Sequence, residues 1–299
     1  MDDRRVTKPR ARDAILVRRD SSATRIDVAM IGKYYRAAKQ WGPFAARTAF
    51  YGTISVTLGP LTREHGASLW AMRRWCRAST KGLSIAVEAD GLENVPASGP
   101  FVYVTNHQSI VDIIVLGSVL PGDYKWAAKR SLFKIPFLGW HLGLAGHVPV
   151  DRGGGARTAA QVIKSFEGVL SSGKPLLIFP EGTRSETGVL KEFKAGGFYA
   201  AVRAGVPVVP VALDGTYDLM MKGALDTGEG NVRHVKVRVG APISPLSSGK
   251  EAKRVADLRD RAQVAVGDLL RSIGGRVEPF GAPGGEARVP LEPSAEAAE

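Results

Sequence analysis

A histidine and an aspartate five positions apart form the clearest catalytic pattern in the sequence. His107 and Asp112 lie in NHQSIVD, directly after the β-rich run FVYVT, and strand ends are where α/β sheets present reactive side chains. A carboxylate that accepts the Nδ1 proton of a histidine leaves Nε2 free as a base, and without a GxSxG motif this base would act directly on a substrate hydroxyl. The alternative is a capping box, in which Asp112 serves only backbone donors near Ser109 and His107 is an ordinary turn residue.

A second polar cluster, FPEGTRS, spans residues 179–185 at the end of another apolar run. A glycine beside an acid and an arginine in a tight loop can direct backbone N–H groups and a bidentate guanidinium at a phosphate. Glu181 could instead pair with Arg184 in an ordinary polar loop. In isolation the motif fits either interpretation.

Other basic and glycine-rich positions are less specific. In GHVPVDRGGG, Arg152 follows an expected strand, but no GK[ST] follows the glycines, so nucleotide triphosphate chemistry has no support. Lys129 and Lys194 lie near expected strand or helix ends, where most lysines are simply solvated. The histidines at 65, 141, 147 and 234 have no metal-ligand spacing, so no metal site is expected.

The elements that would position these residues alternate along the chain. Apolar, β-branched runs predict strands, and amphipathic stretches between and after them predict helices. Because strands this apolar need cover on both faces, the predicted fold class is α/β, with a mostly parallel or mixed sheet covered by helices. The expected strands are 84–89, 101–105, 124–129, 147–150, 175–179, 207–213 and 235–239, and the expected helices are 109–120, 156–172, 194–204 and 250–273.

Residues 28–80 carry a helical pattern ahead of the first expected strand. Apolar residues at spacings of three, four and seven fall on one helical face, and a Gly-Pro pair is expected to separate two helices. These helices either pack on the core or lie in a membrane interface with tryptophans at headgroup depth. The apolar residues are Phe44, Tyr51, Ile54, Leu58 and Leu61, and the tryptophans are Trp41, Trp70 and Trp75.

Composition limits the classes of function. Of 299 residues, 44% are hydrophobic and 23% are charged, which is typical of a globular chain with a sizeable core. The single cysteine, Cys76, excludes a disulfide framework and a cysteine-rich zinc site, and favours a reducing compartment. The net charge of +12 favours a phospholipid surface, a nucleic acid or a phosphorylated substrate as partner. Residues 1–80 hold 16 Lys/Arg against 6 Asp/Glu, so the excess charge is N-terminal.

Targeting and membrane-spanning signals are not evident in the sequence. The first residues, MDDRRVTKPR, lack the apolar core of a secretory signal, and the uncharged run at 48–62 is shorter than the ~20 residues needed to cross a bilayer. A cytoplasmic location is therefore expected. We expect a flexible basic arm at 1–27, an amphipathic helical segment at 28–80, the α/β domain with the motifs at 81–275, and a disordered tail at 276–299.

Four sequence motifs, called blocks here, occur in a fixed order along the chain. Together they identify a protein family more specifically than any one block alone. Together, over roughly residues 82–245, they resemble the glycerophospholipid acyltransferase superfamily, and within it the 1-acylglycerol-3-phosphate acyltransferases. The resemblance favours the catalytic interpretation of His107. The blocks are NHxxxxD with Asn106, His107 and Asp112, a glycine, apolar strand and arginine with Gly146 and Arg152, FPEGTRS in full, and the strand Val209-Pro210-Val211.

This resemblance implies the glycerolipid acyltransferase fold and a reaction in phospholipid biosynthesis. A fatty acyl group would pass from acyl-CoA or acyl carrier protein to the sn-2 hydroxyl of lysophosphatidic acid, giving phosphatidic acid with no cofactor beyond the thioester. His107 would be the general base, and Asp112 would orient it. Pro149 stands where many relatives carry an aromatic residue, which leaves the acyl-chain preference open. The implied substrate-binding residues are Asn106, Lys129, Arg152, Glu181, Gly182, Thr183 and Arg184.

A lipid substrate also explains the basic N-terminal helices. They would hold the protein at an anionic membrane surface, peripheral or monotopic on the cytoplasmic face, at about 1 kcal/mol for each Lys or Arg near the surface. Because all four blocks follow residue 81, a chain lacking residues 1–80 is expected to keep a folded α/β domain.

Two alternatives to this function remain. The acceptor could be another lysolipid, such as lysophosphatidylcholine, lysocardiolipin or the lyso form of an amino-acid lipid, because these share the blocks. The chain could also be a non-catalytic basic membrane-binding protein. A nucleic-acid partner is not expected, since the residues after 80 are nearly charge-balanced and show no recognition module.

Overall fold

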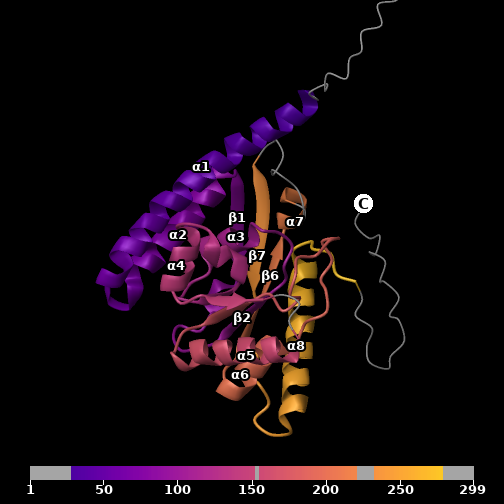
Figure 1. Cartoon of the computed structure of the whole chain (residues 1–299). Helices are drawn as coiled ribbons and strands as arrows, with labels where there is room; N and C mark the ends of the chain where they lie inside the picture. The colour runs from indigo at the N-terminus through magenta and orange to yellow at the C-terminus, as the bar shows by residue number, and fades with distance from the viewer. Residues whose placement is uncertain (1–27, 152–154, 221–231, 279–299) are drawn as a thin grey trace, which may run out of the picture.

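A seven-stranded sheet forms the centre of the computed structural model, which describes residues 28–151, 155–220 and 232–278 (Figure 1). The strand order is β1-β7-β6-β2-β5-β3-β4, and every neighbouring pair is parallel except β6 and β7. The expected α/β class with a mixed sheet is confirmed. The strands are β1 Ile85–Asp90, β2 Val102–Thr105, β3 Lys125–Lys129, β4 Val148–Val150, β5 Leu176–Ile178, β6 Val208–Asp214 and β7 Arg233–Val239.

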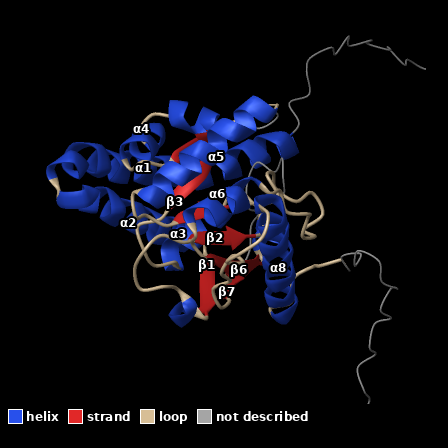
Figure 2. Ribbon diagram, turned by 90° about the horizontal axis from the view of Figure 1, so that it is seen from below, coloured by secondary structure: helices blue, strands red, loops and turns tan. Residues whose placement is uncertain are grey.

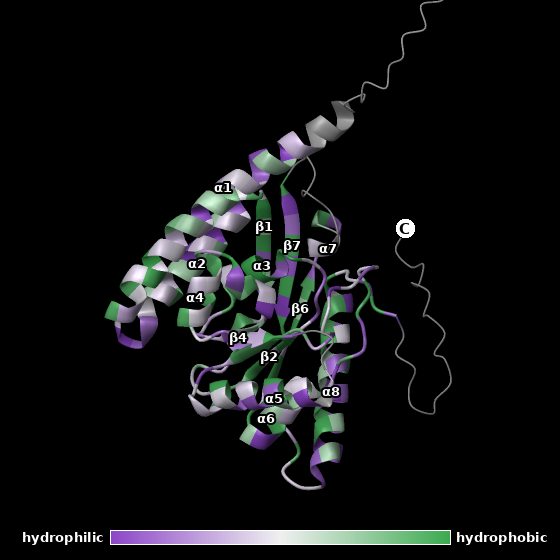
Figure 3. Cartoon of the chain, viewed as in Figure 1, coloured by the Kyte–Doolittle hydropathy of each residue, from purple (hydrophilic) through white to green (hydrophobic). Residues whose placement is uncertain are grey.

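Successive side chains of the central strands point to opposite faces of the sheet, and this alternation divides the hydrophobic core into two layers. In β2, Val102 and Val104 pack in one hydrophobic cluster and Tyr103 packs in the other. All four residues of β2 are buried, as in a parallel strand covered on both faces, whereas Figure 3 shows hydrophilic residues along β7. Each strand lies within two residues of the range predicted from its β-branched run.

Helices cover both faces of the sheet (Figure 2). One layer holds α2, α3 and α4, with α1 packed outside α2 and α4, and the other holds α5, α6 and α8. The four helices expected after residue 100 are present, whereas α4 and α7, at seven and four residues, are too short for a periodic signal. The helices are α1 Val28–Leu58, α2 Gly66–Gly82, α3 Asp112–Val119, α4 Leu138–Leu144, α5 Ala156–Ser171, α6 Gly196–Ala204, α7 Thr216–Leu219 and α8 Glu251–Ser272; the 3₁₀ turns are η1 Gly59–Leu61, η2 Arg63–His65, η3 Leu92–Asn94 and η4 Arg130–Lys134.

The second helix of the N-terminal pair belongs to the hydrophobic core. Met72, Trp75 and Cys76 are buried in the same cluster as residues of the sheet. Cys76 packs so closely on Gly117 of α3 that any side chain at that glycine would collide with the sulfur. Trp75 is 9% exposed and its Nε1 donates a hydrogen bond to Thr48 Oγ1 of α1 at 3.0 Å. The expectation that Trp75 lies at headgroup depth is therefore wrong.

A boundary after residue 80 would cut through this core. Two arginines of α2 also bond to the segment around the end of α3, with Arg73 donating to the carbonyl of Gly122 and Arg77 to that of Ser118. The expectation that a chain lacking residues 1–80 stays folded is therefore not supported. The expected arm at 1–27 and residues 279–299 of the expected tail lie outside the described residues.

The outer surface of the helical pair remains exposed. Phe50 of α1, Leu61 of η1 and Trp70 of α2 are 61%, 80% and 47% exposed. Core packing of α2 and an exposed apolar surface thus coexist in residues 28–80. In the part of the chain that the structure describes, no helix has the length and apolar character to span a membrane.

Candidate active site

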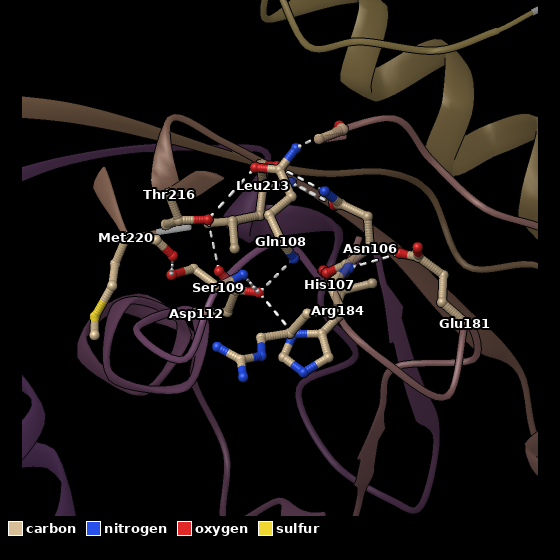
Figure 4. A network of polar contacts seen from close by, with 12 residues as sticks. Asn106, His107, Gln108, Ser109, Asp112, Glu181, Arg184, Leu213, Thr216 and Met220 are labelled. Carbon is tan, nitrogen blue, oxygen red and sulfur yellow. Dashed lines mark hydrogen bonds and ion pairs between the residues drawn. The ribbon is translucent and has the colours of Figure 1, made fainter. Parts of the chain in front are cut away.

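Three strands end at one polar site (Figure 4). In the sheet register, Val104 of β2 pairs with Ile178 of β5 and Pro210 of β6, all in parallel. The loops that follow these strands therefore leave the same edge of the sheet, which is where open α/β sheets bind ligands.

His107 and Asp112 form the expected dyad. His107 Nδ1 lies 2.8 Å from Asp112 Oδ2, and the two side chains are 7% and 0% exposed. An ionised carboxylate accepts here, so the proton resides on Nδ1 and the lone pair on Nε2 is available. Among the described residues, none forms a hydrogen bond with Nε2, which points away from Asp112 in Figure 4. The imidazole is thus prepared to accept a proton.

Asp112 also accepts backbone hydrogen bonds. Its Oδ2 accepts the N–H groups of Gln108 at 2.8 Å and Ser109 at 2.9 Å, and its Oδ1 accepts the Thr216 hydroxyl at 2.6 Å. The capping interpretation is thus correct in part, although the Ser109 hydroxyl donates to the Met220 carbonyl and no reciprocal capping box forms. Four donors hold the carboxylate in one orientation against the imidazole.

Thr216 is a member of this network that sequence reasoning missed. It is fully buried and lies at the start of α7, directly after β6 and a glycine. Its position at the exit of the Val-Pro strand was the available signal, because that exit shares a sheet edge with His107.

The loop after β5 holds the imidazole from another side. Phe179 stacks on His107 with ring centroids 4.1 Å apart and an interplanar angle of 25°. The Ser185 N–H donates to the His107 carbonyl at 2.8 Å. The FPEGTRS segment therefore forms one wall of the site, in addition to any contact that it makes with a ligand.

Glu181 joins the two loops. Its Oε1 accepts the His107 N–H at 2.7 Å, its Oε2 accepts the Lys191 N–H at 3.2 Å, and the residue is 3% exposed. It forms no ion pair with Arg184. Burial raises the pKa of Glu181 to about 7, against the opposing effect of the two N–H bonds. With both oxygens engaged, Glu181 positions His107, and the substrate contact expected from the sequence stays a prediction.

The free energy of unfolding should depend on Glu181 across mildly acidic pH. Because folding raises the pKa of this carboxyl from 4.5 to about 7, the native chain binds its proton more tightly than the unfolded chain. The stability that this group contributes is present below pH 4.5 and is lost as pH rises through about 7. Urea unfolding over this range should show the loss in the wild type and a flatter profile in Glu181→Gln. A Gln variant with the wild-type profile would contradict the assignment.

Asn106 anchors the histidine loop to β6. Its Nδ2 donates to the Leu213 carbonyl at 2.8 Å, its Oδ1 accepts the Leu213 N–H at 2.9 Å, and the residue is 1% exposed. The side-chain amide of Asn106 thus pairs with both backbone groups of Leu213, as a neighbouring strand would. Asn106 therefore positions the loop, and its expected substrate contact stays a prediction.

The other expected binding residues lie around this centre. Gly182 has φ of 75°, a conformation that favours glycine. Thr183 and the half-buried Arg184 follow it, and Figure 4 shows the Arg184 side chain beside the imidazole. Lys129 is exposed at the end of β3, on the same sheet edge, and Arg152 lies outside the described residues.

Two cavities flank the dyad on opposite faces of the sheet. The first, of about 200 Å³, is apolar and is called here the tryptophan cavity. The second, of about 320 Å³, lies between α5 and the ends of β3, β4 and β5 and is called the α5 cavity. Residues lining the tryptophan cavity include Trp41, Trp75, Trp126, Ile110, Val111 and Leu142, and those lining the α5 cavity include Val150, Val162, Phe166, Phe179, Gly182 and Lys194.

A metal centre does not emerge from these residues. Within the described ranges, no group of three or more His, Cys, Asp or Glu side chains is arranged to hold a metal ion.

Comparison with known proteins gives one consistent result. A family model described as Acyltransferase matches residues 86–214. A 1-acyl-sn-glycerol-3-phosphate acyltransferase of Saccharomyces cerevisiae is 32% identical over 232 residues, which cover 77% of this chain and 75% of that protein. The crystal structure of the 1-acyl-sn-glycerophosphate (LPA) acyltransferase PlsC from Thermotoga maritima aligns with a TM-score of 0.66 and 25% identity, covering 80% of this chain and 97% of that chain.

Some relatives are considerably longer than the matched region. The chloroplastic 1-acyl-sn-glycerol-3-phosphate acyltransferase BAT2 of Brassica napus is 42% identical over 153 residues, which cover 51% of this chain but only 43% of that protein. The chain thus spans less than half the length of this relative.

Proposed function

Because the chain belongs to the 1-acyl-sn-glycerol-3-phosphate acyltransferase family, we propose that it transfers a fatty acyl group from an acyl thioester to the sn-2 hydroxyl of 1-acylglycerol-3-phosphate, forming phosphatidic acid. The observation that carries the proposal is the His107–Asp112 pair, with Nε2 open at the sheet edge. A buried histidine oriented in this way suits proton abstraction from a hydroxyl.

The reaction needs one base and an activated acyl donor. His107 Nε2 accepts the sn-2 hydroxyl proton as the oxygen attacks the thioester carbonyl, and Asp112 stabilises the resulting imidazolium. Collapse of the tetrahedral intermediate breaks the C–S bond, and the departing thiolate takes the proton from the imidazolium. The reaction as proposed requires no cofactor beyond acyl-CoA or acyl carrier protein, and no acyl-enzyme.

The acceptor's phosphate requires cations close to the dyad. Gly182, Thr183 and Arg184 lie in the loop that contacts His107, and the Arg184 guanidinium can form a bidentate pair with phosphate. We assign Arg152 and Lys129 to the same task on the basis of the family pattern alone.

The tryptophan cavity suits a fatty acyl chain. It is lined by apolar side chains, which include Ile110 and Val111 directly after the histidine loop. A chain in this cavity would leave its carbonyl carbon near the dyad. Apolar surface buried on binding contributes ~25 cal/mol per Å² before ordering costs.

A transfer assay with purified protein tests the proposal. Radiolabelled acyl-CoA or acyl carrier protein is offered with lysophosphatidic acid, lysophosphatidylcholine or lysocardiolipin as acceptor, and phosphatidic acid should be the preferred product. Preference for another acceptor would change the head group that we assign to the acceptor but would leave the proposed acyl-transfer reaction unchanged. Membrane binding without any transfer would favour the non-catalytic alternative.

Replacing Thr216 should slow catalysis without weakening substrate binding. Thr216→Val keeps the shape of the side chain but removes the donor to Asp112, so we expect kcat to fall about tenfold, as for loss of one hydrogen bond to a charged group. The KM for lysophosphatidic acid should change less than about twofold, because Thr216 touches only the dyad network. Thr216→Ser should restore kcat, whereas equal loss in both variants would show that the hydroxyl is not the cause.

The exposed surface of the helical pair supports a membrane partner. Phe50, Leu61 and Trp70 lie there together with Arg74, which stacks over Trp70 at 5.6 Å. Apolar side chains beside cations suit the interface of an anionic membrane. We therefore propose that the protein binds a membrane peripherally or as a monotopic protein, on the cytoplasmic face that the sequence led us to expect, and propose no nucleic-acid partner.

A triple substitution measures this contact. Phe50→Ser, Leu61→Ser and Trp70→Ser together should weaken binding to phosphatidylglycerol vesicles at least tenfold, since burying one such side chain contributes roughly 1.5–3 kcal/mol. Vesicle flotation at high salt isolates this apolar part, because charge attraction is screened there. Val264→Ser is the matched control: Val264 is 55% exposed on α8, in the opposite layer. Equal binding of the triple variant and the control would exclude this surface.

A further inference from the structure

The chain after α8 crosses a loop that continues the FPEGTRS motif. Residues 275–278 are called here the C-terminal strap, and residues 185–190 are called the 185–190 loop. The Leu190 N–H donates to the Arg276 carbonyl at 3.2 Å, and Val277 packs against the hydrophobic cluster that includes residues of α8. The strap therefore fixes the far end of the 185–190 loop, although residues 276–278 lie in the tail expected from the sequence.

The side chain of Arg276 contacts both the 185–190 loop and α7. Its Nη1 donates to the Thr187 carbonyl at 3.3 Å. Its guanidinium lies over the Tyr217 ring at 5.5 Å, and its Nη2 is 3.5 Å from Asp218 Oδ1. Because the side chain is 58% exposed, these contacts contribute little to the stability of the whole fold. Their main effect is to hold a loop and a short helix together.

Tyr217 of α7 contacts the same loop. Its hydroxyl donates to the Glu186 carbonyl at 2.8 Å. Gly188 has φ of 78°, and a Cβ at that position would lie 3.0 Å from atoms of the Tyr217 ring. The loop and α7 thus pack closely, and Arg276 covers the tyrosine ring that lies between them.

The 185–190 loop contacts the histidine loop at two points. Gln108 Nε2 donates to the Gly188 carbonyl at 3.3 Å. The Ser185 N–H donates to the His107 carbonyl at 2.8 Å. The position of the 185–190 loop therefore helps to determine the position of the catalytic base.

The helix α7 contacts the other half of the dyad. Thr216 donates to Asp112 at 2.6 Å, and the two residues that follow Thr216 are the ones that contact Arg276. The 185–190 loop thus supports His107, whereas α7 supports Asp112. Arg276 contacts both supports without contacting either member of the dyad.

We propose that Arg276 is a positioning residue for acyl transfer, which holds the 185–190 loop and α7 together so that His107 and Asp112 keep their hydrogen bond. A guanidinium suits this task because its planar fork of donors can serve a carbonyl and a carboxylate while its face stacks on a ring. This inference rests on the proposed function and adds a residue that lies outside the four blocks.

Steady-state kinetics test the positioning role. Arg276→Ala should lower kcat about three- to tenfold, as for loss of one ordinary hydrogen bond, and leave both KM values within about twofold. Arg276→Lys should recover part of kcat, because an ammonium can still donate to Thr187 and pair with Asp218. A higher KM for lysophosphatidic acid with unchanged kcat would show that the loop positions the acceptor, and would overturn the proposal.

Another arginine near the end of α8 is the matched control. Arg271 is 48% exposed and pairs with Asp268 of the same helix. Arg271→Ala removes a comparable surface contact that does not reach the 185–190 loop, so its kcat should equal that of the wild type. An equal loss of kcat in Arg271→Ala and Arg276→Ala would contradict a specific role for Arg276.

Amide hydrogen exchange tests the coupling without any turnover. In Arg276→Ala the N–H groups of Leu190 and Ser185 should exchange at least about threefold faster, whereas that of Val104 in β2 should keep its rate. If the wild type transfers no acyl group, the proposed function fails, but exchange still tests the coupling. An unchanged rate at Ser185 would show that the effect of Arg276 stops short of His107. Equal acceleration at Val104 would show general destabilisation, and either result overturns the proposal.

Discussion

His107→Ala should lower kcat by ~10²–10⁴-fold, the usual contribution of a general base, and leave the protein folded. The fold should survive because Asp112 keeps three hydrogen-bond donors, the N–H groups of Gln108 and Ser109 and the Thr216 hydroxyl. Initial rates with acyl-CoA and lysophosphatidic acid give kcat, and thermal melting reports the fold. A near-normal turnover would mean that Nε2 is not the base.

Asp112→Asn is the matched partner of that experiment. An amide oxygen in place of Oδ2 can still accept from His107, Gln108 and Ser109, and the Thr216 hydroxyl can turn to accept from the amide nitrogen while facing Gln108 Oε1 at 3.4 Å. We expect a folded variant with residual activity above that of His107→Ala, because the imidazole keeps its orientation but loses the charge beside it. Full activity in Asp112→Asn would assign Asp112 to capping alone.

Deletion of residues 1–80 should leave a chain that does not fold. The deletion removes Met72, Trp75 and Cys76 from the core they share with the sheet. Truncating one large core side chain costs ~2–5 kcal/mol, and a whole domain is stable by only ~5–15 kcal/mol. Circular dichroism and size-exclusion chromatography should show an aggregated or unfolded product.

A pair of tryptophans on α2 controls for the deletion. Trp75→Ala should lower the free energy of unfolding by ~3–5 kcal/mol, whereas Trp70→Ala, at a position 47% exposed, should change it far less. A chain beginning at residue 28 keeps every contact described above and should melt like the full chain. A monomeric, cooperatively melting product of the 1–80 deletion would show that α2 is not required for the core.

The strands could be predicted because their signal is local. Runs such as VYVT and VVPVALD are β-branched and apolar, and a buried parallel strand requires little else. The partner of an amphipathic helix is not local information. From the sequence, the apolar face of α2 could have contacted either lipid or protein. The burial of Met72, Trp75 and Cys76 in the core shows that it contacts protein.

The dyad was predictable for the same reason, and its supports were not. His107 and Asp112 are five residues apart in one motif, so their contact is nearly a local property. Glu181, Leu213 and Thr216 reach the histidine loop across 74 or more positions, and the sequence indicates at most that their strands end at the same sheet edge, not which atoms meet. Motif matching therefore identified Glu181 as part of the site but did not predict its contact with the His107 backbone.

The anchoring of the histidine loop has a thermodynamic consequence for catalysis. Asn106 through Ser109 are all buried, and each is bonded to a segment distant in the sequence: to Leu213, Glu181, Gly188 and Met220 in turn. The conformational entropy of these four residues is lost when the chain folds, before any substrate arrives. Binding energy is then not consumed in ordering the base, and more of it remains to lower the barrier of the acyl-transfer step.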